Sequence, residues 1–222
     1  ENGILLRGPV VGNVTLPKTG GISYLVSGVG GTPDGSGTLS FPNANGLEVS
    51  AGSSLTLTSG VILKSKNEVG IGVKGGLNLL GTPTDPVIYT AINDDTVGGS
   101  VKVVSIQPSF GSGGYLRFHP GSTGEINNTT IKYGSNPFRA TASTLINNGG
   151  VVNVTDSVIT ENKYYAIYQL AGTTTIHTSS IGNVGRQGIF NALAAPLDAT
   201  NNYWGDPSGP KHPTINPAGL GA

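Results

Sequence analysis

The chain has 222 residues with no cysteine and no methionine, and its 12 basic and 12 acidic residues cancel. These features exclude a disulfide framework and a thiolate metal site, and they argue against electrostatic capture of nucleic acid or an anionic membrane. No stretch reaches 18 apolar residues, so we predict no membrane span. Glycine accounts for 36 residues, about twice its usual share, which is typical of a turn-dense β protein.

Residues 1–23 contain two apolar clusters that do not fit the spacing of the later chain. Because the open end of a repetitive β structure exposes unpaired strand edges, we interpret this segment as an N-terminal cap. Tyr24 then begins the first regular strand. The alternative is that the segment adds a strand to a neighbouring copy. In that case the partner-contact residues are Ile4, Leu5, Leu6, Val10 and Val11.

The next segment contains two successive sets of three short apolar clusters. Most clusters alternate apolar, polar and apolar residues, which predicts short strands whose middle residue points outward. The first set begins at Leu47, Leu55 and Val61, and the second at Ile71, Leu77 and Val87. Charged residues between or within these clusters are then expected to be solvated: Lys64, Lys66, Glu68 and Lys74.

Two insertions, residues 91–114 and 134–141, interrupt this rhythm. Loops on a rigid scaffold often carry function. The first insertion contains Asp94 and Asp95, which we interpret as solvated loop acids. The alternative is a weak calcium site, since calcium takes about 6–8 oxygen ligands and two carboxylates supply few of them. We predict no other cofactor.

The second insertion brings aromatic residues near one another. Phe138 and Arg139 lie in it, and Tyr164 and Tyr165 follow in the next repeat. We expect the insertion to pack against the coils. The alternative is a surface patch that stacks on sugars or contacts another protein.

The section from Ser143 to Trp204 repeats every 22 residues, as Leu145, Ile167 and Ile189 illustrate. A fixed period of this length predicts a solenoid. Three short strands per repeat, stacked about 4.8 Å apart, describe a parallel β-helix. Polar residues at equal positions should form a ladder whose amides hydrogen-bond along the axis. That ladder comprises Asn147, Gln169 and Asn191.

One turn recurs before the third strand of several repeats. It places threonine before aspartate, serine or asparagine, whose side chains cap their own backbone. The pairs are Thr84 with Asp85, Thr155 with Asp156, Thr178 with Ser179, and Thr200 with Asn201.

Two segments resemble a known family. "GGLNLLGTPTDPVIYT" at residues 75–90 and "NNYWGDPSGP" at residues 201–210 are similar to segments of exported bacterial and archaeal β-helix proteins of the pectate-lyase-like superfamily. The resemblance spans residues 24–210 and implies an exported right-handed parallel β-helix. These motifs mark coils and an end cap, so they imply no particular activity. Trp204 is expected to cover the last coil's open core.

Catalysis by polysaccharide lyases or hydrolases on such a fold requires clustered carboxylates. In the strict repeat, Asp156 aligns with Thr178, and Glu161 aligns with Asn183. Asp198 aligns with Ile176. No carboxylate therefore stacks on another in this section, which predicts a protein without an active site.

The sequence thus predicts one all-β domain, residues 1–222, folded as a right-handed parallel β-helix of about seven coils. The coils occupy residues 24–204, and residues 205–222 form a C-terminal cap or tail. We expect an extracellular or cell-surface structural or adhesive protein that self-associates. The alternative is a carbohydrate-binding or polysaccharide-cleaving domain that uses the insertions, which acids gathered beside Arg117 or Arg139 would favour.

Overall fold

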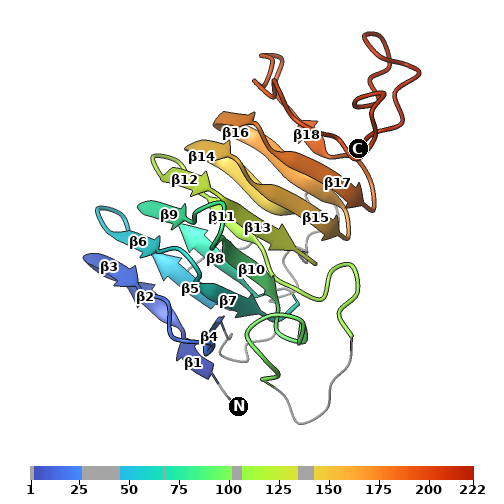
Figure 1. Cartoon of the computed structure of the whole chain (residues 1–222). Coiled ribbons are helices and arrows are strands. Elements are labelled where there is room, and N and C mark those ends of the chain that lie inside the picture. Colours follow the sequence, from blue (N-terminus) through green and yellow to red (C-terminus); the bar gives the residue numbers. More distant parts are fainter. Residues whose placement is uncertain (1–2, 27–45, 68, 102–106, 135–142) are drawn as a thin grey trace, which may run out of the picture.

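The computed structural model describes residues 3–26, 46–67, 69–101, 107–134 and 143–222. In these ranges the regular structure consists only of β-strands, stacked in one direction from the N-terminus to the C-terminus (Figure 1). No helix long and apolar enough to cross a membrane occurs among them. The predicted all-β class is therefore confirmed.

Seven strands form the first sheet, here called sheet A, and all its neighbouring pairs are parallel. Each step along this sheet returns the chain to the same side of the molecule. The order is β1 (Gly3–Leu6), β4 (Ser23–Val26), β7 (Ile62–Ser65), β10 (Val87–Ala91), β13 (Thr129–Lys132), β15 (Val158–Asn162) and β17 (Ser180–Val184).

The second sheet, sheet B, bends around a corner and so has two faces. Its first face contains β2 (Gly8–Val10), β5 (Gly46–Val49), β8 (Gly70–Val73) and β11 (Leu116–Phe118). Its second face contains β3 (Asn13–Leu16), β6 (Ser54–Leu57), β9 (Gly76–Leu80) and β12 (Thr123–Asn127). β14 (Ser143–Thr155) pairs with β11 early and with β12 late, so it continues from one face to the other. β16 (Tyr165–His177) stacks on β14, and β18 (Ile189–Asn191) stacks on β16.

The strand registers confirm the predicted repeat. Leu145 pairs with Ile167, which pairs with Ile189. The earlier sets also align as expected, since Leu47 pairs with Ile71 and Leu55 with Leu77. These parallel stacks are compatible with a parallel β-solenoid. The sequence predicted three separate strands per repeat, whereas β14 and β16 each run through two of them.

The prediction that strands begin at Tyr24 is wrong. β1, β2 and β3 precede it and pair with β4, β5 and β6 of the same chain. The period is hidden there because residues 27–45, which lie outside the described ranges, separate β4 from β5 in the sequence. Val10 therefore pairs with Val49, 39 positions later, instead of about 22.

The predicted self-capping of the turn before sheet A holds at Ser179, whereas the carboxylates of Asp85 and Asp156 accept hydrogen bonds from Lys18 and Thr178 in other turns. Ser157 Oγ donates to Thr155 O at 2.7 Å, and Ser179 Oγ makes the same bond one turn later to His177 O at 2.8 Å. The residue at the bend has positive φ in four successive turns, a conformation that asparagine and aspartate tolerate. The four are Asn128 (44°), Asp156 (49°), Thr178 (49°) and Asn201 (60°).

The core is one continuous stack of apolar side chains between the sheets, mostly aliphatic with Tyr24, Tyr89 and Phe118 among them, and side-chain sizes match within it. The position between Leu77 and Val152 on the second face is Gly124. The ring of buried Phe118 fills the space beside it, because a Cβ at Gly124 would lie 2.5 Å from Phe118 Cε1. A large residue on one face thus accompanies a missing side chain on the other.

The predicted polar ladder aligns, but its hydrogen bonds differ from the prediction. Asn147 lies beside Gln169 in the register, yet its amide bonds the backbone of the bend between the two faces. Asn147 Oδ1 accepts from Gly150 N at 2.8 Å and Gly149 N at 3.2 Å. Its Nδ2 donates to Gly150 O and Thr173 O. The buried amide therefore shapes the bend of β14 and does not link one ladder member to the next.

Asn147→Ala is expected to lower the free energy of unfolding by about 2 kcal/mol, because buried backbone groups lose their partners. Urea unfolding followed by circular dichroism measures this change. Asn191→Ala, at the half-buried end of the same ladder, is the matched control and should change stability by less than half as much. Equal losses in both variants would contradict the role given to Asn147.

Trp204 packs against the C-terminal end of the core, as predicted. The tail returns to it, since Ala222 N donates to Trp204 O at 2.8 Å. Tyr203 pairs with Ser180, one position before the Ile181 that the repeat predicts. The last turn is therefore one residue longer than the strict repeat.

Candidate functional site

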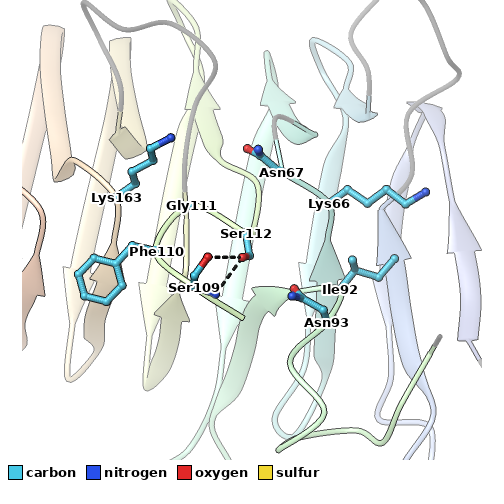
Figure 2. Close-up of a pocket in the computed structure, with 9 residues that line it drawn as sticks. All are labelled: Lys66, Asn67, Ile92, Asn93, Ser109, Phe110, Gly111, Ser112 and Lys163. Atoms are coloured by element: carbon cyan, nitrogen blue, oxygen red, sulfur yellow. Dashed lines mark hydrogen bonds between the residues drawn. The ribbon is translucent and has the colours of Figure 1, made fainter. Parts of the chain in front are cut away.

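The connections from sheet A to the first face of sheet B all emerge on one corner of the stack, here called the insertion corner. Both insertions predicted from the sequence belong to it. A hollow of about 530 Å³ lies there (Figure 2). Its polar lining comes from Lys66 and Asn67 after β7, Asn93 after β10, Lys163 after β15, and the turn of residues 109–112.

The turn of residues 109–112 is closed by its own serines. Ser112 N donates to Ser109 O at 2.9 Å, and Ser109 N donates to Ser112 Oγ at 2.9 Å. Phe110 at its tip is 41% exposed. Figure 2 shows this turn between Lys66 and Lys163, which stand on opposite sides of the hollow. The turn therefore presents hydroxyl groups and an aromatic ring between two ammonium groups.

The charged side chains that line this hollow are all of one sign. Among its described lining residues, Lys66 and Lys163 carry positive charge and none is acidic. The chain as a whole has no net charge. Lys163 Nζ also lies 5.4 Å from the centroid of the Tyr164 ring, an interaction that holds an ammonium group near the surface. The hollow is thus suited to a negatively charged ligand.

A buried ionic cluster lies on the outer side of sheet A, next to the first insertion. Lys132 Nζ is 2.8 Å from Asp94 Oδ2, and Asp94 has no exposed side-chain surface. Thr90 Oγ1 donates to Asp94 Oδ2 at 2.7 Å. Lys64 Nζ donates to Asp94 O at 2.8 Å and to Gly99 O at 2.6 Å. The insertion is therefore held down on sheet A by charge as well as by the small apolar cluster of Leu25, Ile92 and Val101.

The cluster changes the interpretation of two predicted positions. Lys64 was expected to be solvated, but it is fully buried, and burial lowers its pKa. Burial disfavours the charged form of Asp94, but hydrogen bonds from Lys132, Thr96 and Thr90 outweigh that effect and lower its pKa. Both Asp94 oxygens are engaged in these contacts. Calcium binding by Asp94 and Asp95 stays a prediction, and in the described chain no three acidic or histidine side chains form a metal-binding group.

The aromatic residues of the second predicted patch lie near the C-terminal part of the insertion corner. Tyr165 contacts Tyr168 and Phe190, with ring centroids 5.6 and 5.3 Å away. Arg186 Nη1 donates to Tyr165 OH at 3.3 Å, and its guanidinium also lies near the Tyr164 ring. Phe138 and Arg139 lie outside the described residues, so contact of this patch with a sugar or a protein stays a prediction.

The predicted N-terminal contact residues occupy the first strands of the stack. Ile4, Leu5 and Val11 are exposed, at 41%, 46% and 74%. Leu6 is half-buried and Val10 is buried against the core. The structure therefore divides this group into exposed members and members that complete the chain's own core.

A hydroxyl, an imidazole and a carboxylate meet near the C-terminal end, which the sequence did not predict. His177 Nδ1 lies 3.0 Å from Thr200 Oγ1, and His177 Nε2 lies 3.4 Å from Asp198 Oδ2. Thr200 Oγ1 also donates to Asp198 Oδ1 at 3.2 Å. Because the three groups bond one another on an exposed surface outside the hollow, they connect the last two turns of the stack.

Acidic residues gathered beside Arg117 or Arg139 would favour an enzyme. Arg117 lies on β11. Burial lowers its pKa. The second position, Arg139, is outside the described ranges. In comparisons with known proteins, no family model, curated protein or solved structure matches this chain.

Proposed function

We propose that this chain is a right-handed parallel β-helix that serves as a rigid, non-catalytic subunit of an extracellular or cell-surface assembly. The proposed number of about seven coils is supported by the first-face strands, which are β2, β5, β8, β11, β14, β16 and β18. Continuous core packing along this stack supports rigidity. The resemblance of two segments to exported β-helix proteins supports the location and the handedness.

The N-terminal end is the proposed assembly contact, and its incomplete core is the observation that carries the proposal. Ile4 belongs to the same inward column of sheet A as Tyr24 and Leu63. Those two side chains are 5% and 1% exposed, whereas Ile4 is 41% exposed. Among the described strands, β1, β2 and β3 pair on one side only. In the described part of the chain no strand pairs with their outer edges, and we propose that strands from a second copy add there.

The C-terminal end of the stack is covered, which favours pairing between the N-terminal ends of two copies. Trp204 and Ala222 pack on the C-terminal end of the core, so the two ends of the stack present different surfaces. A contact between identical ends is closed by two-fold symmetry. Under that symmetry the edge strands of one copy run antiparallel to the edge strands of the other. We therefore expect a discrete pair as the first product of association.

Ile4→Lys is expected to shift the chain from pairs to monomers, because a charge at the core end opposes burial and strand addition. Sedimentation and light scattering over a range of concentrations measure the shift. Leu80→Lys is the matched control, since Leu80 is 42% exposed on β9, away from the N-terminal end. A wild-type chain that stays monomeric at all concentrations, or equal effects of both variants, would contradict the proposal.

A further inference from the structure

We infer that the hollow at the insertion corner binds an elongated anionic ligand that carries phosphate or sulfate groups on a ring-bearing scaffold. This inference uses a different part of the molecule from the N-terminal contact and does not depend on it. Its volume, about 530 Å³, lies within the range of small-molecule sites.

The separation of the two lysines defines the length of the ligand. Lys66 follows β7 and Lys163 follows β15, and sheet A places β10 and β13 between these strands. Three strand spacings correspond to roughly 14 Å. This is the spacing of the strands that carry the lysines, whose side chains stand on opposite sides of the hollow (Figure 2), so a ligand that contacts both in this arrangement carries at least two anionic groups.

The basic residues of the lining favour tetrahedral oxyanions, such as phosphate and sulfate, as the anionic groups of the ligand. Carboxylates are matched best by the planar fork of arginine, whereas lysine acts as a point charge with three donors. Both described cations of the lining are lysines. The side-chain amide of Asn67 and one hydroxyl of the Ser109–Ser112 pair, whose oxygens lie 3.2 Å apart, add uncharged donors in the same hollow. Phosphate and sulfate groups, which offer several oxygens in different directions, suit this donor set.

Phe110 adds a requirement for a ring or a comparable apolar surface. Its side chain is 41% exposed and stands on the Lys163 side of the turn (Figure 2). An exposed aromatic ring beside donors is a stacking surface for the apolar face of a ring. A free chain of phosphates would use the lysines but leave Phe110 without a contact.

Titration calorimetry of the full chain at low salt tests the inference with four probes. Sucrose octasulfate presents sulfate esters on rings, and inorganic tripolyphosphate presents the same kind of anion without a ring. Citrate is the carboxylate control, and sucrose is the neutral control. We expect sucrose octasulfate to bind most tightly, tripolyphosphate to bind more weakly, and neither control to bind measurably.

Variants locate the binding. Lys66→Gln and Lys163→Gln should each weaken octasulfate binding about tenfold or more, because each removes a charge-assisted contact. The double variant should abolish it. Phe110→Ala should weaken octasulfate but leave tripolyphosphate unchanged. Lys211→Gln, an exposed lysine of the C-terminal tail, is the matched control and should bind as the wild type does.

Three results would overturn the inference. Neither oxyanion probe binds, citrate binds as tightly as octasulfate, or the double lysine variant retains wild-type affinity. Thermal melting of each variant excludes unfolding as the cause of lost binding. Because neither Lys66 nor Lys163 lies on β1, β2 or β3, loss of ligand binding and loss of pairing are separately measurable in the same preparations.

Discussion

Asp94→Asn is expected to lower the free energy of unfolding by about 3–5 kcal/mol, the range found when one partner of a buried ion pair is removed. Asp94 has no exposed surface, and Lys132 is 2.8 Å from its carboxylate. The amide of asparagine keeps the volume but removes the charge paired with Lys132, and it leaves Asp95 as the remaining acid that acts on buried Lys64. Chemical unfolding at pH 7 measures the loss.

The effect should depend on pH with a defined sign. The pKa of Asp94 is lowered in the folded chain, so its stabilising contribution is present above the ordinary carboxyl pKa of about 4. It is lost as the pH falls through the lower folded value. The difference between wild type and Asp94→Asn should therefore shrink in acid. Asp156→Asn is the matched control, because Asp156 is exposed at a bend that asparagine also tolerates. A constant difference across the pH range would contradict the ionic explanation.

Phe118→Ala is expected to cost about 3–5 kcal/mol of unfolding free energy, since it empties a fully buried aromatic position. Gly124→Ala should cost about 1–3 kcal/mol, because its methyl group would overlap the Phe118 ring. Combining Gly124→Ala with Phe118→Leu should recover part of that cost, as the smaller side chain makes room. Urea unfolding of these variants and of Phe118→Leu alone measures these values.

Phe110→Ala is the control for the loss of an aromatic side chain, because Phe110 is partly exposed in the turn of residues 109–112. It should change stability by less than about 0.5 kcal/mol. If the effects of Phe118→Leu and Gly124→Ala were simply additive, the two sites would be independent. The size match across the core would then be wrong.

The sequence predicted the strand registers wherever apolar residues recur at nearly constant steps. Leu145 and Ile167 are such a pair, and their alignment needed only the period. The same reasoning failed for Val10 and Val49, because residues 27–45 break the step between them. Periodicity detects a ladder only while the turns between its members keep similar lengths.

The candidate sites were less predictable because they depend on how insertions fold back. Alternation correctly placed Lys64 on the outer side of its strand, but an outward position was taken to be a solvated one. The loop that carries Asp94 folds back over Lys64, and no local sequence pattern predicts this fold-back. The hollow at the insertion corner has the same origin, since Lys66 and Lys163 are distant in sequence and three strand spacings apart in sheet A.

The positive-φ bends at Asn128, Asp156, Thr178 and Asn201 make one corner of the stack short and nearly uniform over the last four turns. The insertion corner also has recurring positive-φ residues, at Tyr133, Glu161 and Asn183, but its connections differ widely in length. One corner thus maintains the pitch while another accepts extra residues. For protein engineering, this makes the insertion corner the place to graft a foreign loop without disturbing the register.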